Sequence, residues 1–225
     1  MPYALCPMPY AQSYLIFLRT AIDYLVEDLP KMLTSMKIGC DRIKNISTSL
    51  RIFSRADTVN KVEANIHEGL NSTLMILRHR LKANEKHPEI PIIKEYGKIP
   101  KVQCYLGQLN QVFMNLLANG IDALEKSNQR RNFAEIIAHS NQITIRTKVE
   151  GKKVIIAIAD NGNGMSEEVK NRIFDHLFTT KDVGKGTGLG LAITRQIVEE
   201  KHGGKLSCIA ARGEGTEFVI EILID

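Results

Sequence analysis

The sequence predicts an α/β sandwich, in which a mixed sheet carries helices on one face, preceded by an α-helical segment. Two observations lead to this fold class. Apolar residues repeat at helical spacing over residues 18–53, whereas helix-like and strand-like stretches alternate in one block from about residue 61 to residue 225. The chain therefore divides into a helical segment, residues 1–60, and a larger domain, residues 61–225.

Composition narrows the class of protein. Of the 225 residues, 44% are hydrophobic and 24% are charged, as in an ordinary globular chain. Basic residues are scattered among acidic ones and aromatic residues are not interleaved with them, so we expect no nucleic-acid partner. The four cysteines include no C-x-x-C pair and indicate reduced thiols rather than a zinc site. Because the apolar run Tyr14–Leu18 is too short to span a bilayer, we expect a cytoplasmic chain without a membrane span.

The helical segment carries a heptad pattern. Apolar residues step by four and three from Leu18 to Phe53, with Gly39 the only exception. Because a helix interior resists proline, we expect a break or kink at Pro30 and a new helix from about Lys31. An amphipathic helix packed on its own domain would show a similar pattern. A repeat this strict favours a partner helix, so we expect a homodimer through residues 18–53.

The larger domain alternates helix patterns and strand patterns. Extended segments are expected near residues 62–66, 90–96, 101–106, 142–150, 152–160, 205–210 and 216–223. Helical spacing predicts helices at about 67–82, 107–126 and 189–201. The polar stretch 127–142 predicts a loop or irregular insertion, and Gly151 predicts a hairpin turn. The basic cluster Leu77–Lys82 indicates a solvated helix face.

The stretch GKGTGLGLAI, Gly184–Ile193, places four glycines at every second position before an apolar helix pattern. Bare backbone in front of a helix N-terminus suits an anion, most plausibly a phosphate. The dinucleotide fingerprint G-x-G-x-x-G does not match, because Leu189 or Leu191 falls where its last glycine belongs. The P-loop pattern fails as well, since Gly186 follows Lys185. A flexible surface loop would also explain the glycines, so other segments must decide.

The predicted helix at 107–126 has an unusual polar face. Its polar residues fall within roughly 80° of one another at helical spacing; they are Gln108, Gln111, Asn115, Asn119 and Asp122. Asparagine is a poor helix former, so two of them four residues apart call for a reason. An amide oxygen is a hard, uncharged ligand that suits Mg²⁺. A merely solvated face is the alternative, although such faces more often use Glu, Lys and Arg.

Two further segments contain polar groups in unusual settings. The apolar strand pattern at 152–160 ends in Asp160, followed by Gly162 and Gly164. This carboxylate could accept a hydrogen bond from an exocyclic amine while the glycines admit a flat ring, although an ordinary turn is also consistent. The next stretch, IFDHLFTTK, combines apolar anchors with a hydroxyl pair and Lys181, and it looks like a lid.

Taken in their order along the chain, the four segments described above resemble the catalytic ATP-binding domain of sensor histidine kinases. This family lies within the group that includes gyrase and the mismatch-repair and heat-shock-chaperone ATPases. NQVFMNLLANGIDAL looks like the N box, DNGNGM and GKGTGLGLAI like the two glycine boxes, IFDHLFTTK like the F box and GEGTEF like the terminal strand motif. The resemblance covers roughly Val62–Asp225. It implies a Bergerat-type ATP-binding fold with ATP and Mg²⁺ as cofactors.

The resemblance also implies roles for individual residues. Asn119 would ligate Mg²⁺, with Asn115 beside it near the phosphates. Asp160 would receive the adenine amine, with Gly164 and Thr216 lining the base. Lys181 and the backbone of residues 186–189 would meet the phosphates, and Asn115 and Lys181 would be catalytic. The full set of expected nucleotide contacts is Asn115, Asn119, Asp122, Asp160, Gly162, Gly164, Met165, Thr180, Lys181, Gly184, Gly186, Thr187, Gly188, Leu189, Gly190 and Thr216.

One part of the family pattern is missing. Residues 39–55 resemble the second helix of the dimerisation and histidine-phosphotransfer hairpin, but no histidine precedes His67. The resemblance therefore implies a kinase that phosphorylates a histidine in trans, with a histidine-bearing hairpin or a response regulator as partner. A non-catalytic module that binds nucleotide and dimerises is the alternative. An ATPase of the gyrase or chaperone type is a third possibility, but those relatives generally carry a glutamate where Asn115 stands.

Overall fold

The computed structural model describes residues 19, 20, 22, 24–37, 39, 40, 43, 60–84, 87–128, 131, 133–181 and 188–224. The chain divides into two compact units, an N-terminal unit, Met1–Ser47, and a main unit, Thr48–Asp225. Residues 44–59 lie outside the described residues, so a domain boundary at residue 60 stays a prediction.

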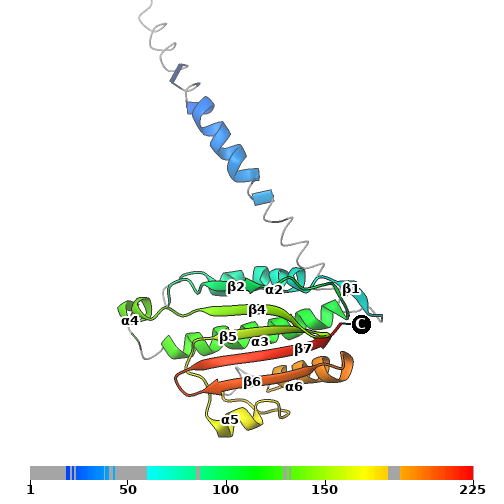
Figure 1. Cartoon of the computed structure of the whole chain (residues 1–225). Helices are drawn as coiled ribbons and strands as arrows, with labels where there is room; N and C mark the ends of the chain where they lie inside the picture. The colour runs from blue at the N-terminus through cyan, green and yellow to red at the C-terminus, as the bar shows by residue number, and fades with distance from the viewer. Residues whose placement is uncertain are drawn as a thin grey trace, which may run out of the picture. The chain divides into compact units, whose positions relative to one another are not determined.

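The N-terminal unit is helical over residues 24–37 (Figure 1). A break at Pro30 with a new helix from Lys31 is wrong, because residues on both sides of Pro30 belong to one helical run, whereas a kink there stays a prediction. A proline removes one N–H from the helix and its ring crowds the carbonyl four residues before it, but the helical contacts of its neighbours remain. Here Lys31 Nζ pairs with Glu27 Oε1 at 2.8 Å, and Thr34 Oγ1 donates to the Pro30 carbonyl oxygen at 2.7 Å.

The main unit is built on a five-stranded sheet with the order β2-β4-β5-β7-β6. The strands are β2 (Ile92–Tyr96), β4 (Ile143–Glu150), β5 (Lys153–Asp160), β6 (Lys205–Ala211) and β7 (Gly215–Leu223). The β2–β4 pair is parallel and the other pairs are antiparallel, so the sheet is mixed, as predicted. Two short strands, β1 (Val62–Ala64) and β3 (Val102–Cys104), form a separate antiparallel pair.

Helices cover one face of this sheet, which confirms the predicted fold class (Figure 1). They are α2 (Ile66–Leu81), α3 (Leu106–Asn128), α6 (Gly190–Gln196) and the π-helical turn η2 (Ile197–Lys201). Asn65 caps α2, since its side chain accepts a hydrogen bond from the His67 amide at 3.0 Å. The polar stretch predicted as a loop contains a short helix, α4 (Phe133–Ala138), and a second short helix, α5 (Glu167–Arg172), was not predicted.

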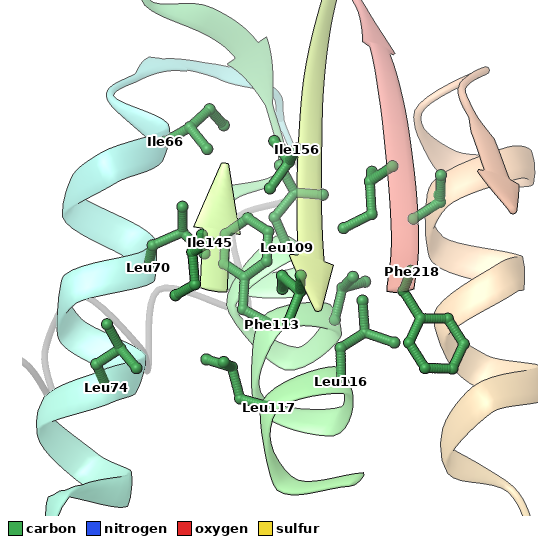
Figure 2. Close-up of a cluster of buried hydrophobic side chains, with 14 of the residues drawn as sticks. Ile66, Leu70, Leu74, Leu109, Phe113, Leu116, Leu117, Ile145, Ile156 and Phe218 are labelled. Carbon is green, nitrogen blue, oxygen red and sulfur yellow. The ribbon is translucent and has the colours of Figure 1, made fainter. Parts of the chain in front are cut away.

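A single hydrophobic core joins the helices to the sheet (Figure 2). The apolar side of α3 supplies side chains that are at most 1% exposed, namely Leu109, Val112, Phe113, Leu116, Leu117 and Leu124. Ile66, Leu70 and Leu74 of α2 pack beside them, and Ile145, Ile156 and Phe218 come from the strands. The apolar stripe that predicted α3 is therefore its buried face, and the polar stripe remains for other contacts.

Candidate functional site

The polar stripe of α3 meets the lysine at the end of the F-box segment. Lys181 Nζ donates to Asn119 Oδ1 at 3.1 Å and pairs with Asp122 Oδ2 at 2.5 Å. Three of the predicted site residues are therefore in direct contact, although about sixty positions separate Lys181 from the other two. The Asn119 oxygen faces a cation, which is the contact expected of an amide oxygen that could also serve Mg²⁺.

Asn115, one turn before Asn119, contacts α6. Its Nδ2 donates to the Gly190 carbonyl oxygen at 3.1 Å and to Thr194 Oγ1 at 3.2 Å. The Asn115 side chain lies directly against the start of α6, since a Cβ added at Gly190 would be in ordinary van der Waals contact with Asn115 Cγ at 3.7 Å. These bonds hold the start of α6 against α3, and they leave Oδ1 as the atom of Asn115 suited to a cation.

Asp160 ends β5 as a buried carboxyl, 9% exposed. Burial raises its pKa to about 6, while a hydrogen bond from the Gly162 amide to Oδ1, at 3.0 Å, acts in the opposite direction. Thr216 lies opposite Asp160 on β7 and is 7% exposed. α3 passes close by, since a Cβ added at Gly120 would lie 3.6 Å from Asp160 Cβ. Asp160 therefore lies beside the turn of α3 that contains Asn119.

The segment after Asp160 depends on glycine. Gly164 has φ +61°, and a Cβ there would lie 1.8 Å from the Ala211 carbonyl oxygen, so no larger residue fits. Asn161 anchors the same segment, because its Oδ1 accepts from the Gln142 amide at 2.7 Å. Met165 is partly buried against the core. Gly162, Gly164 and Met165 therefore lie in the segment that directly follows Asp160, and their role as a wall of the base site stays a prediction.

The glycine-rich segment is described only at its end. Gly184, Gly186 and Thr187 lie outside the described residues. Gly188 packs against the F-box segment, since a Cβ there would lie 2.4 Å from the Leu177 carbonyl carbon. Leu189 and Gly190 follow directly and lead into α6. Lys181 at the end of IFDHLFTTK and Gly190 at the start of α6 therefore both contact the polar stripe of α3, through Asn119 and Asn115.

Thr180 is exposed, and no contact of its side chain with the other predicted residues is among the hydrogen bonds of the described part of the chain. Its neighbour Thr179 instead orients the segment, because Thr179 Oγ1 accepts from the Lys181 amide at 3.2 Å.

Sequence reasoning missed Arg80. Its Nη2 donates to Asp122 Oδ1 at 2.6 Å and to Glu125 Oε1 at 2.9 Å, so α2 is tied to the polar stripe of α3. The basic cluster was predicted to be a solvated face, but the Arg80 side chain is only 25% exposed. A signal was present, because Arg80 lies beside the buried positions Leu77 and Leu81 and hence at the border of the apolar stripe.

Carboxylates and thiols do not form a metal centre in the described part of the chain, where no three His, Cys, Asp or Glu side chains cluster suitably. A magnesium ion would depend instead on an amide oxygen, phosphate oxygens and water, which is the donor set Mg²⁺ accepts. None of the helices among the described residues is long and apolar enough to cross a bilayer.

Comparison with known proteins settles the family. The profile of the histidine kinase-, DNA gyrase B- and HSP90-like ATPases matches residues 106–225, more than half of the chain. The chain belongs to this family. The predicted resemblance is confirmed, and the main unit is a histidine kinase-type catalytic ATP-binding domain.

Curated relatives are sensor kinases. The chain is 31% identical over 191 residues to sensor kinase CckA of Brucella abortus, covering 83% of this chain and 19% of that protein. It is 32% identical over 200 residues to the two-component sensor PprA of Pseudomonas aeruginosa, covering 89% of this chain and 20% of that protein. The chain thus spans about a fifth of the length of these relatives.

Solved structures agree on the fold. The catalytic domain of histidine kinase ThkA superposes with a TM-score of 0.57 at 28% identity, over 73% of this chain and 96% of that one. Full-length ShkA in complex with AMPPNP gives a TM-score of 0.57 at 20% identity, over 97% of this chain and 40% of that one.

Proposed function

We propose that this histidine kinase-type domain binds Mg-ATP and transfers the γ-phosphoryl group to a histidine of another chain. The observation that carries the proposal is the meeting of Lys181 with Asn119 on one face of α3, next to the buried carboxyl of Asp160. Membership of the ATPase family and the sensor-kinase relatives support it.

Each residue would act through position and charge. Mg²⁺ would neutralise phosphate charge when bound, and the Asn119 oxygen would hold it with Asn115 beside it. The Asp160 carboxylate would accept the adenine amine, with Gly162, Gly164, Met165 and Thr216 around the base. The phosphates would lie against Lys181, Thr180 and the backbone of Gly184, Gly186, Thr187, Gly188, Leu189 and Gly190. Phosphoryl transfer requires little more than such positioning and neutralisation.

The acceptor would be supplied in trans. His87 and His202 are 3% and 5% exposed, too buried to meet a triphosphate. The His67 ring is stacked on Tyr96 with centroids 4.2 Å apart, and its Nε2 bonds to Thr147 Oγ1. None of the six histidines has an H-box sequence around it. The expected partner is a histidine-bearing hairpin or a response regulator, and ThkA has been solved in complex with the response regulator protein TrrA.

Asn115 weighs against an ATPase of the gyrase type. An amide cannot take a proton from water as a glutamate can, and the Asn115 nitrogen is already bonded to α6. Hydrolysis would therefore lack its general base at this position.

Transfer of label tests the proposal. We expect γ-radiolabelled ATP to label a separately added H-box hairpin on an acid-labile site, and this chain to remain unlabelled. The Asp160→Asn variant serves as the negative control. Label on this chain would overturn transfer in trans, tight binding without any transfer would favour the non-catalytic module, and fast multiple-turnover hydrolysis would favour an ATPase.

A further inference from the structure

Four charged side chains form one continuous row beside the proposed phosphate site. Arg80 bridges Asp122 Oδ1, at 2.6 Å, and Glu125 Oε1, at 2.9 Å. Lys181 takes the other oxygen of Asp122, at 2.5 Å. Asp122 thus binds two cations through different oxygens, one from the helix layer and one from the lid segment. Their side chains are 25–41% exposed, so the row is partly withdrawn from water.

The two cations of Asp122 differ in how they are anchored. Arg80 belongs to α2, whose residues Leu77 and Leu81 are buried in the core next to α3. Lys181 instead is the last residue of the segment IFDHLFTTK and follows the exposed pair Thr179 and Thr180. Its side chain can therefore turn away from Asp122 while Arg80 stays in place.

The proposed function requires Lys181 to move. In the structure Lys181 Nζ lies on Asn119 Oδ1, the oxygen assigned to Mg²⁺, and an ammonium group and Mg²⁺ on the same oxygen would repel each other strongly. When Lys181 turns to the phosphates, Asp122 keeps its negative charge one helical turn from Asn119. Without another counter-ion that carboxylate would repel the triphosphate.

We infer that Arg80 is a positioning residue for Mg-ATP: it neutralises and fixes Asp122, so that Lys181 can exchange from this carboxylate to the phosphates. This inference rests on the proposed function, and it assigns Asp122 to the control of Lys181 rather than to direct contact with the nucleotide. The planar guanidinium suits the task because it bonds two carboxylates at once, which an ammonium group does less well.

Nucleotide titration of three single variants tests the inference. We expect Arg80→Gln to raise the Kd for a Mg-bound non-hydrolysable ATP analogue about tenfold, and Arg80→Lys to raise it less. The matched control is Arg146→Gln, which removes the ion pair with Glu217 on β4 and β7 and should leave the Kd unchanged. Calorimetry gives the Kd, and thermal unfolding confirms that each variant is folded.

A double variant separates charge from packing. If Arg80 acts by neutralising Asp122, then Arg80→Gln combined with Asp122→Asn should bind the analogue as tightly as Asp122→Asn alone. This comparison also stands if Arg80→Gln alone does not fold. The inference would be overturned if the double variant had a higher Kd than Asp122→Asn, or if Arg80→Gln had the same Kd as Arg146→Gln. Failure of the unaltered protein to bind the analogue would instead count against the proposed function.

Discussion

Asp160 is a carboxyl held where ionisation is unfavourable. Burial raises its pKa to about 6 from 3.8, and the Gly162 amide only partly compensates. A carboxyl whose folded-state pKa is raised contributes stability below pH 3.8 that is lost as the pH rises through about 6. At neutral pH the folded protein therefore carries a buried carboxylate whose ionisation costs stability, which is the pattern expected of a residue that binds a ligand.

Replacing this carboxyl should separate binding from stability. We expect Asp160→Asn to weaken nucleotide binding by about 1–3 kcal/mol, or roughly 5–150-fold, because the adenine amine loses a buried acceptor. The same change removes the buried charge, so the free energy of unfolding at pH 7.5 should stay equal or increase. Calorimetry and thermal unfolding measure the two effects. An unaltered affinity would show that Asp160 does not contact the base.

Nucleotide binding should also depend on pH. Because the Asp160 carboxyl takes up a proton near pH 6, we expect the affinity for an ATP analogue to fall between pH 7.5 and pH 5. The Asp160→Asn variant provides the control, since its weaker affinity should change less over the same range. Parallel pH profiles for the two proteins would assign the dependence to another group.

At the scale of elements, the spacing of apolar residues predicted the positions of those helices and strands that bury one face. It located α2, α3 and the five strands of the sheet, because their apolar residues recur at the spacing that burial demands. It missed α4 and α5, which have six residues each and give too few turns for a period to show. The expected break at Pro30 was also wrong, since the helix continues there although proline has no amide hydrogen.

The site was predictable in its residue types but not in its contacts. The stripe of Asn115, Asn119 and Asp122 follows from helical geometry. The Arg80 bridge does not, because it depends on α2 lying beside α3, which is a tertiary arrangement. Likewise, nothing local indicates that Asn115 bonds to α6, seventy-five positions further along the chain.

Gly120 gives a test within α3. A Cβ added here would lie 3.6 Å from Asp160 Cβ and Ile143 Cδ1 and 3.8 Å from Asp160 Oδ2, which are ordinary contact distances. We expect Gly120→Ala to stabilise the protein by up to about 1 kcal/mol, raising Tm by roughly 2–4 °C, because glycine is a poor residue for a helix interior. Thermal unfolding measures this. Gly164→Ala is the opposing control and should be destabilising, since its Cβ would clash at 1.8 Å.

At the scale of the whole molecule, the N-terminal unit lacks a core among its described residues. The apolar positions of the heptad repeat form the predicted dimer seam. Those at Leu25, Leu29, Met32 and Met36 are 54–65% exposed. Burying a Leu or Met side chain stabilises a structure by about 1.5–3 kcal/mol, so a helix with this surface gains from a partner of the same pattern. The homodimer through residues 18–53 stays a prediction, and these exposed side chains support it.

Adjacent residues provide a matched test of the dimer. Leu25 occupies the predicted seam, whereas Tyr24 lies outside it, and their exposures of 65% and 67% are nearly equal. We expect Leu25→Glu to weaken self-association of the full chain at least about a hundredfold. Each of the two copies would lose a buried leucine, and the two introduced glutamates would repel each other. Tyr24→Glu introduces the same charge outside the seam and should change the dimer dissociation constant little.

Sedimentation equilibrium over a concentration series gives both constants, and an unchanged Kd for the ATP analogue shows that the main unit is intact. Equal constants for the two variants would place the contact on another face of the helix, and a chain that is monomeric at every concentration would exclude the homodimer.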